Sequence, residues 1–147
     1  AAAPRSSASG SEAAQAHAFI AEATLAVLHN VSIHAGMRPA VAAAVDNASL
    51  PDLLVATIVR CAEERAAAAD GRIDALNVAA RALGVTGKLV LASAALQAAA
   101  STAIPALLQW VGATPPSHST VLEREYVDTC VENAALTIAA LVSQGEA

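Results

Sequence analysis

The chain has 147 residues, which is enough for one domain of ordinary size with its own core. Hydrophobic residues make up 56% of it and charged residues only 14%, with a net charge of −5. The eight Lys and Arg residues are scattered along the chain, so the basic cluster that nucleic-acid binding needs is absent from the sequence.

Alanine dominates the composition and aromatic residues make up only 2%. Alanine is the best helix former, whereas strands favour β-branched and aromatic side chains. We therefore predict an all-α fold: a single-domain, Ala-rich bundle of about five to seven antiparallel helices. The bundle is expected to cover residues 11–147, after a flexible N-terminal arm of small and polar residues at 1–10.

The sequence begins with "AAAPRSSASGSEAAQ", which has neither an initiator Met nor the apolar region of a signal peptide. It is typical of a mature end left after a transit or signal peptide is removed, or of a trimmed chain. Processing would place the protein in a mitochondrion or plastid, or outside the cell, and the sequence does not choose between them. Glycosylation sequons at Asn30 and Asn47 slightly favour secretion.

The first helix is predicted from Ser11 to Asn30, with Glu12 in its first turn, where the helix dipole favours a negative charge. Residues at helical spacing give this helix one apolar face: Phe19, Ile20, Ala23 and Val27. Further helices are predicted over 39–47, 50–69, 73–83, 88–102, 104–112 and 120–143. Gly84 is expected to end one helix, and Pro105 to separate two others.

No charged residue occurs between Lys88 and Glu123. The stretch is long enough for a membrane span, but its small and polar residues and Pro105 argue against a single span. A helix without charges lies in the core or is covered by a partner, and we keep both alternatives. In the second case the 89–112 surface binds other protein subunits through its large side chains: Leu89, Leu91, Leu96, Ile104, Leu107, Leu108 and Trp110.

No motif predicts a catalytic, cofactor-binding or metal site. His29 and His34 are five residues apart, which does not place them on one helix face as a metal pair. The segment "GVTGKL" lacks the first Gly and the Ser or Thr of a phosphate-binding loop. Cys61 and Cys130 are expected to be either two buried thiols or one disulfide between helices.

These features favour a protein that is not an enzyme. The preferred hypothesis is a helical subunit of a larger protein assembly, organellar and membrane-associated in one version, which acts by helix–helix packing. The alternative is a secreted or lumenal helical module that encloses an apolar ligand or pigment, or that inhibits an enzyme. A Cys61–Cys130 disulfide or glycans at Asn30 or Asn47 would favour this alternative.

Overall fold

The computed structural model of this chain describes residues 2–145, and these residues form seven α-helices and no strand. The predicted all-α fold, a single helical bundle, is confirmed. Residue 1 of the predicted arm and residues 146–147 of the predicted bundle lie outside the described residues. The helices are α1 (Ala2–Ser32), α2 (Arg38–Asn47), α3 (Pro51–Ala67), α4 (Leu76–Leu89), α5 (Ala94–Ser101), α6 (Ile104–Val111) and α7 (Val121–Gly145).

Helix α4 is the centre of the bundle and packs against α1, α3 and α7. Its side chains Leu83, Val85 and Leu89 are completely buried. The Arg81 guanidinium lies 5.9 Å from the centre of the Tyr126 ring. Seven residues further along each helix, Lys88 Nζ donates a hydrogen bond to Asn133 Oδ1 at 3.0 Å.

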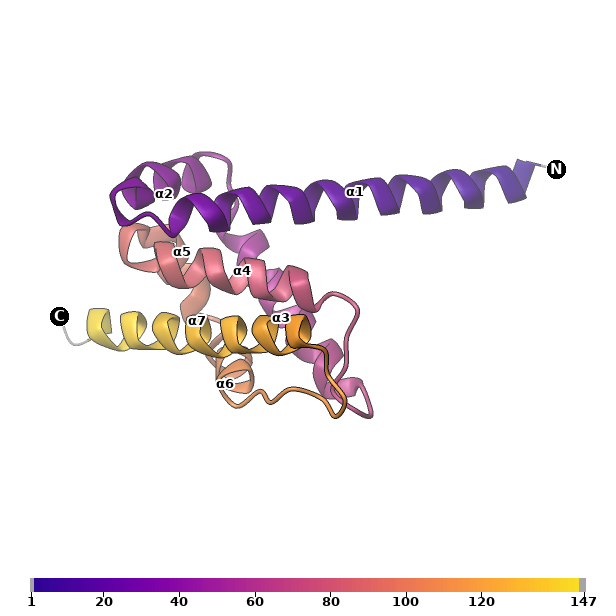
Figure 1. Ribbon diagram of the computed structural model, residues 1–147. Coiled ribbons are helices and arrows are strands. Elements are labelled where there is room, and N and C mark those ends of the chain that lie inside the picture. Colours follow the sequence, from indigo (N-terminus) through magenta and orange to yellow (C-terminus); the bar gives the residue numbers. More distant parts are fainter. Residues whose placement is uncertain (1, 146–147) are drawn as a thin grey trace.

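These two contacts show that α4 and α7 run in the same direction, and Figure 1 shows α1 pointing the same way. The structure differs here from the antiparallel packing expected for neighbouring helices. Antiparallel neighbours result from short connections between consecutive helices. Here residues 90–120, with α5 and α6, carry the chain back across the bundle before α7 begins.

Two glycines inside α4 let its neighbours approach closely. A Cβ atom at Gly84 would lie 2.4 Å from His29 Nε2 on α1, and one at Gly87 would lie 2.8 Å from Asn133 Cβ on α7. Gly84 therefore does not end a helix, as its position in the sequence suggested. Helix α4 continues through both glycines because close packing on two sides stabilises it.

Two other boundaries differ from expectation. Residues 2–10, the predicted arm, continue α1, and Pro4 is compatible with this because it lies in the first turn. The helix expected over 88–102 is divided by a 3-10 turn at Val90–Ala92. Ser93 then caps α5, since its Oγ accepts a hydrogen bond from the Leu96 amide at 3.0 Å and donates one to Asp46 at 2.6 Å.

Helix α7 begins at a capping box. The Thr120 hydroxyl accepts a hydrogen bond from the Glu123 amide, and the Glu123 carboxylate accepts one from the Thr120 amide, both at 3.0 Å. The hydrogen bond from the Thr120 backbone is the main reason why the pKa of Glu123 is lowered. Glu123 also pairs with Arg72, which joins the loop before α4 to the start of α7.

We predict that replacing Gly87 with Ala destabilises the protein by about 1–3 kcal/mol, although Ala has the higher helix propensity. The added methyl group would collide with Asn133, whose side chain is 2% exposed and held between α4 and α7. Gly36→Ala is the matched control, because nothing lies within 4 Å of that position. Urea denaturation measures both, and equal stability of the two variants would contradict the close-packing role.

Candidate functional site

Helix α1 has one face on the bundle and an apolar face that is exposed. Leu25, Leu28 and the half-buried His29 contact the rest of the fold. At about 100° per residue, the exposed positions lie on the opposite side of the helix. We call these residues the α1 seam: Ala13, Ala16, Ile20, Ala23 and Val27.

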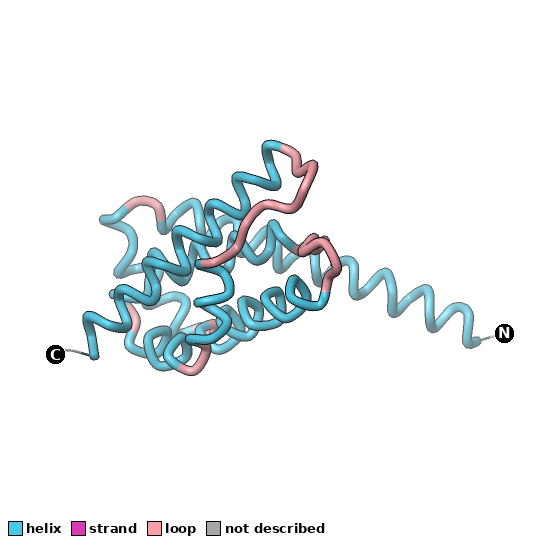
Figure 2. Tube along the Cα trace, turned by 90° about the horizontal axis from the view of Figure 1, so that it is seen from below, coloured by secondary structure: helices cyan, strands magenta, loops and turns pink. Residues whose placement is uncertain are grey.

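The seam includes residues that the sequence identified as the apolar face of the first helix. The structure turns them to solvent, with Ile20 60% exposed, Val27 61% and the neighbouring Phe19 72%. Leu25 and Leu28 pack against the core instead, on the side of α1 that also places the His29 ring against Gly84 of α4. Figures 1 and 2 show that the N-terminal part of α1 extends beyond the other helices.

A groove between α1 and α3 lies beside the seam and has a volume of about 260 Å³. Its lining is aliphatic except for two threonines, and the Thr57 hydroxyl is already bonded to the Leu53 carbonyl at 2.8 Å. Leu53, at its edge, is 63% exposed. The residues that line it are Ala21, Thr24, Leu25, Leu28, Leu50, Leu53, Leu54 and Thr57.

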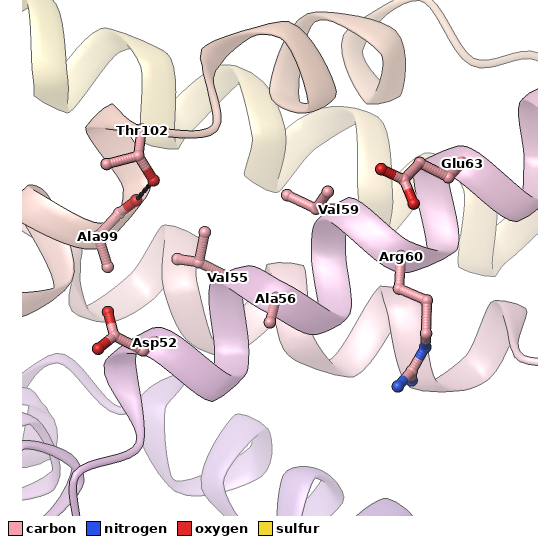
Figure 3. A pocket seen from close by; sticks show the side chains of 8 residues that line it. All are labelled: Asp52, Val55, Ala56, Val59, Arg60, Glu63, Ala99 and Thr102. Atoms are coloured by element: carbon pink, nitrogen blue, oxygen red, sulfur yellow. Dashed lines mark hydrogen bonds between the residues drawn. The ribbon is translucent and has the colours of Figure 1, made fainter.

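A second groove of about 340 Å³ lies between α3 and α5. Figure 3 shows Val55 and Val59 pointing into it, with Asp52 and Glu63 toward its two ends and Arg60 directed away. The two acidic residues are eleven positions apart on α3, or about 16 Å along the axis. Two carboxyl groups that act on one glycosidic bond lie about 5–9.5 Å apart, so this pair does not have that geometry.

The residues of the predicted 89–112 interface are divided between the core and the surface. Leu89, Leu96, Leu107 and Trp110 are buried, and Ile104 is partly buried. The Trp110 indole donates a hydrogen bond to the Ile58 carbonyl at 3.1 Å, which ties α6 to α3. Leu91 and Leu108 are 67% and 56% exposed, so they are the predicted interface residues that a partner can reach.

No single helix within residues 2–145 combines the length and hydropathy of a membrane span. Two bent helix pairs do meet that test together. One is Ala94–Ser101 with Ile104–Val111, which meet at 83° near Pro105, and the other is Gln15–Ser32 with Ala35–Asn47, at 111°.

The predicted sulfur pair lies inside the bundle. Cys61 on α3 and Cys130 on α7 are free, buried thiols. Burial raises the pKa of Cys130 to about 12, and the nearby Cys61 adds to the rise. Burial also raises the pKa of Cys61. Cys61 is close enough to affect the Cys130 thiol, but in the structure no disulfide joins the two residues.

A small polar cluster holds α1 and α7 on α4. The Arg81 guanidinium is 3.5 Å from His29 Nδ1, and Lys88 is bonded to Asn133 on the other side. Burial lowers the pKa of His29, and the positive charges of Arg81 and Lys88 lower it further. Among the residues that the structure describes, no three His, Cys, Asp or Glu side chains gather as metal ligands would.

Comparisons with protein families, with curated proteins and with solved structures find no match for this chain. The α1 seam, the strongest candidate site, was partly readable from the sequence. Its members are separated by steps of three and four residues, and this heptad spacing predicts one apolar helix face. The spacing did not predict whether that face points to the core or to solvent.

We predict that thiol reagent reacts slowly with the native protein at pH 8, because both cysteines are buried and the pKa of each is raised. In denaturant without reductant, two thiols per chain should react rapidly. If no thiol reacts in denaturant before reduction and two thiols react after reduction, Cys61 and Cys130 form a disulfide.

We also predict that mild acid weakens the fold through His29. Because its pKa is lower in the folded state, the unfolded chain binds a proton first as the pH falls through about 6.5. As the pH falls from about 6.5 to the folded-state pKa, the free energy of unfolding therefore decreases. Above about pH 6.5, His29 does not change it. Denaturation between pH 8 and 5 measures this slope.

The variant His29→Gln should reduce this slope, because glutamine stays neutral. His17→Gln is the matched control, since His17 is exposed on the same helix. Identical pH slopes in the wild type and His29→Gln would show that His29 does not couple the packing of α1 to pH.

Proposed function

We propose that this chain is a non-catalytic helical subunit of a larger protein assembly, which it joins by helix–helix packing. The observation that carries the proposal is the α1 seam, an apolar helix face that points away from the bundle. Helices in proteins are stabilised mostly by tertiary packing of an apolar face rather than by intrinsic helix propensity. A partner helix on the seam would supply that packing for α1.

The exposed side chains of the 89–112 segment offer a second contact of the same kind. Leu91 and Leu108 lie in a stretch of the sequence without charges, so their neighbours along the chain bring no ion to a partner surface that covers them. An organellar location is the prediction that accompanies this function.

The alternative function, a secreted or lumenal module for an apolar ligand, is favoured by the α1–α3 groove. Its lining is aliphatic, and its volume of about 260 Å³ is slightly below the range of about 300–1,000 Å³ that is usual for ligand pockets, so it suits a short hydrocarbon chain better than a pigment. Organic extraction of the natively purified protein, followed by mass spectrometry, tests this function. Protein that carries no stoichiometric apolar molecule would speak against it.

We predict that the natively expressed chain migrates in a complex larger than its own dimer, and that Ile20→Glu releases it. The glutamate would place a charge in the middle of the apolar contact, and its burial there is costly. Sedimentation of a detergent-free and a mildly detergent-treated extract measures the complex. Gln15→Glu is the matched control, because it adds the same charge to α1 at an exposed position outside the seam. A wild-type chain found free in both extracts would contradict the proposal.

A further inference from the structure

We propose that the α1 seam pairs with the α1 seam of a second copy of this chain, as a short antiparallel coiled coil with two-fold symmetry. This inference rests on the proposed function, since it names the partner that covers the seam. Five exposed residues with steps of three, four, three and four carry it: Ala13, Ala16, Ile20, Ala23 and Val27. Such steps keep one seam facing a partner helix in a left-handed supercoil.

The sizes of the side chains select the antiparallel direction. In an antiparallel pair with its axis between residues 21 and 22, Ile20 of each copy lies opposite Ala23 of the other. Val27 likewise lies opposite Ala16, so each large side chain meets a small one and the helices interdigitate evenly. A parallel pair would set Ile20 on Ile20 and Ala16 on Ala16, with alternately crowded and loose layers.

The residues beside the seam permit this pairing. In the same register His17 lies beside Thr24 of the other copy, and Phe19 lies beside Ala26. No like charges meet among these positions. Glu12, seven residues before Phe19, also flanks the seam, but in this register it lies beside Ile33 of the other copy. Two chains with a net charge of −5 each can therefore associate without two carboxylates facing each other.

The orientation of α1 in the bundle also permits it. The seam lies on the side of α1 opposite Leu25 and Leu28, which contact the bundle. When two seams pair, the bundles of the two copies therefore lie on opposite sides of the helix pair. The N-terminal part of α1 extends beyond the other helices in both views, which leaves room for the second copy (Figures 1 and 2).

The area buried between the two seams sets the expected stability of the dimer. The exposed fractions of Phe19, Ile20 and Val27, with the three seam alanines, correspond to on the order of 450 Å² per copy. The total of roughly 900 Å² is below that of a standard interface, about 1,200–2,000 Å². The dimer should therefore be weak, with dissociation at low concentration.

The first test is sedimentation equilibrium of the purified full chain from micromolar to near-millimolar concentration. The apparent mass should rise from one chain toward two, and Ile20→Glu should remove the rise while Gln15→Glu leaves it. Circular dichroism confirms that each variant is folded, which is expected because both positions are exposed. A wild-type chain that stays monomeric throughout would overturn the inference.

Cross-linking tests the register. Chains with Ala16→Cys are mixed with chains with Val27→Cys and oxidised with oxidised glutathione, and the mixed pair should link. Ala16→Cys alone should not link, because the two positions lie about 16 Å apart in the antiparallel pair, beyond disulfide reach. If Ala16→Cys links to itself but not to Val27→Cys, the pair is parallel and the inference is overturned. Gln15→Cys, at an exposed position outside the seam, is the control for disulfides that form by random collision.

The two proposals can fail separately. A monomeric chain whose native complex is still released by Ile20→Glu would overturn self-pairing and keep the assembly function, with another protein on the seam. A chain that dimerises when pure but forms no larger native complex would keep the self-pairing and overturn the assembly function.

Discussion

The close approach of α1 and α7 to α4, made where α4 has glycines, determines most of this structure. At Gly84 the His29 ring occupies the space that a side chain would fill, and at Gly87 the Asn133 side chain does the same. Small residues at helix contacts let backbones approach and increase the packing area per residue. In a chain with so few aromatic residues, this short separation replaces the area that large side chains would supply.

The same contact decides which surface of the molecule is free. His29 packs against Gly84, and with this face of α1 on the bundle Ile20 and Val27 are turned to solvent. The polar cluster around His29 then adds an electrostatic condition, since Arg81 and Lys88 both disfavour a charged imidazole. The packing of α1 and the exposure of its seam are thus two consequences of one fit.

The local features of the sequence predicted the helices well where a cap or a proline acts within one turn. Pro51 and Pro105 lie in the first turns of α3 and α6, where proline is tolerated, and the Thr120 hydroxyl caps α7. Ser49 precedes α3 but does not cap it, because the cap residue is Leu50. The predictions failed where the deciding partner is distant in sequence. Gly84 looked like a helix end until His29, which is 55 positions away, was placed against it. The 89–112 segment likewise combined side chains that belong to the core with two that remain exposed.

By itself the sequence determined that the protein is helical, because alanine content and helix caps act locally. It also determined that α1 has a regular apolar face, because spacing along one helix is a local property. Only the tertiary structure decided that this face points outward and that Leu89, Leu96, Leu107 and Trp110 point inward. The physical reason is that a helix with several apolar faces can be rotated about its axis at little cost. The choice is made by the fit of a few side chains, such as His29 against Gly84, between segments far apart in the chain.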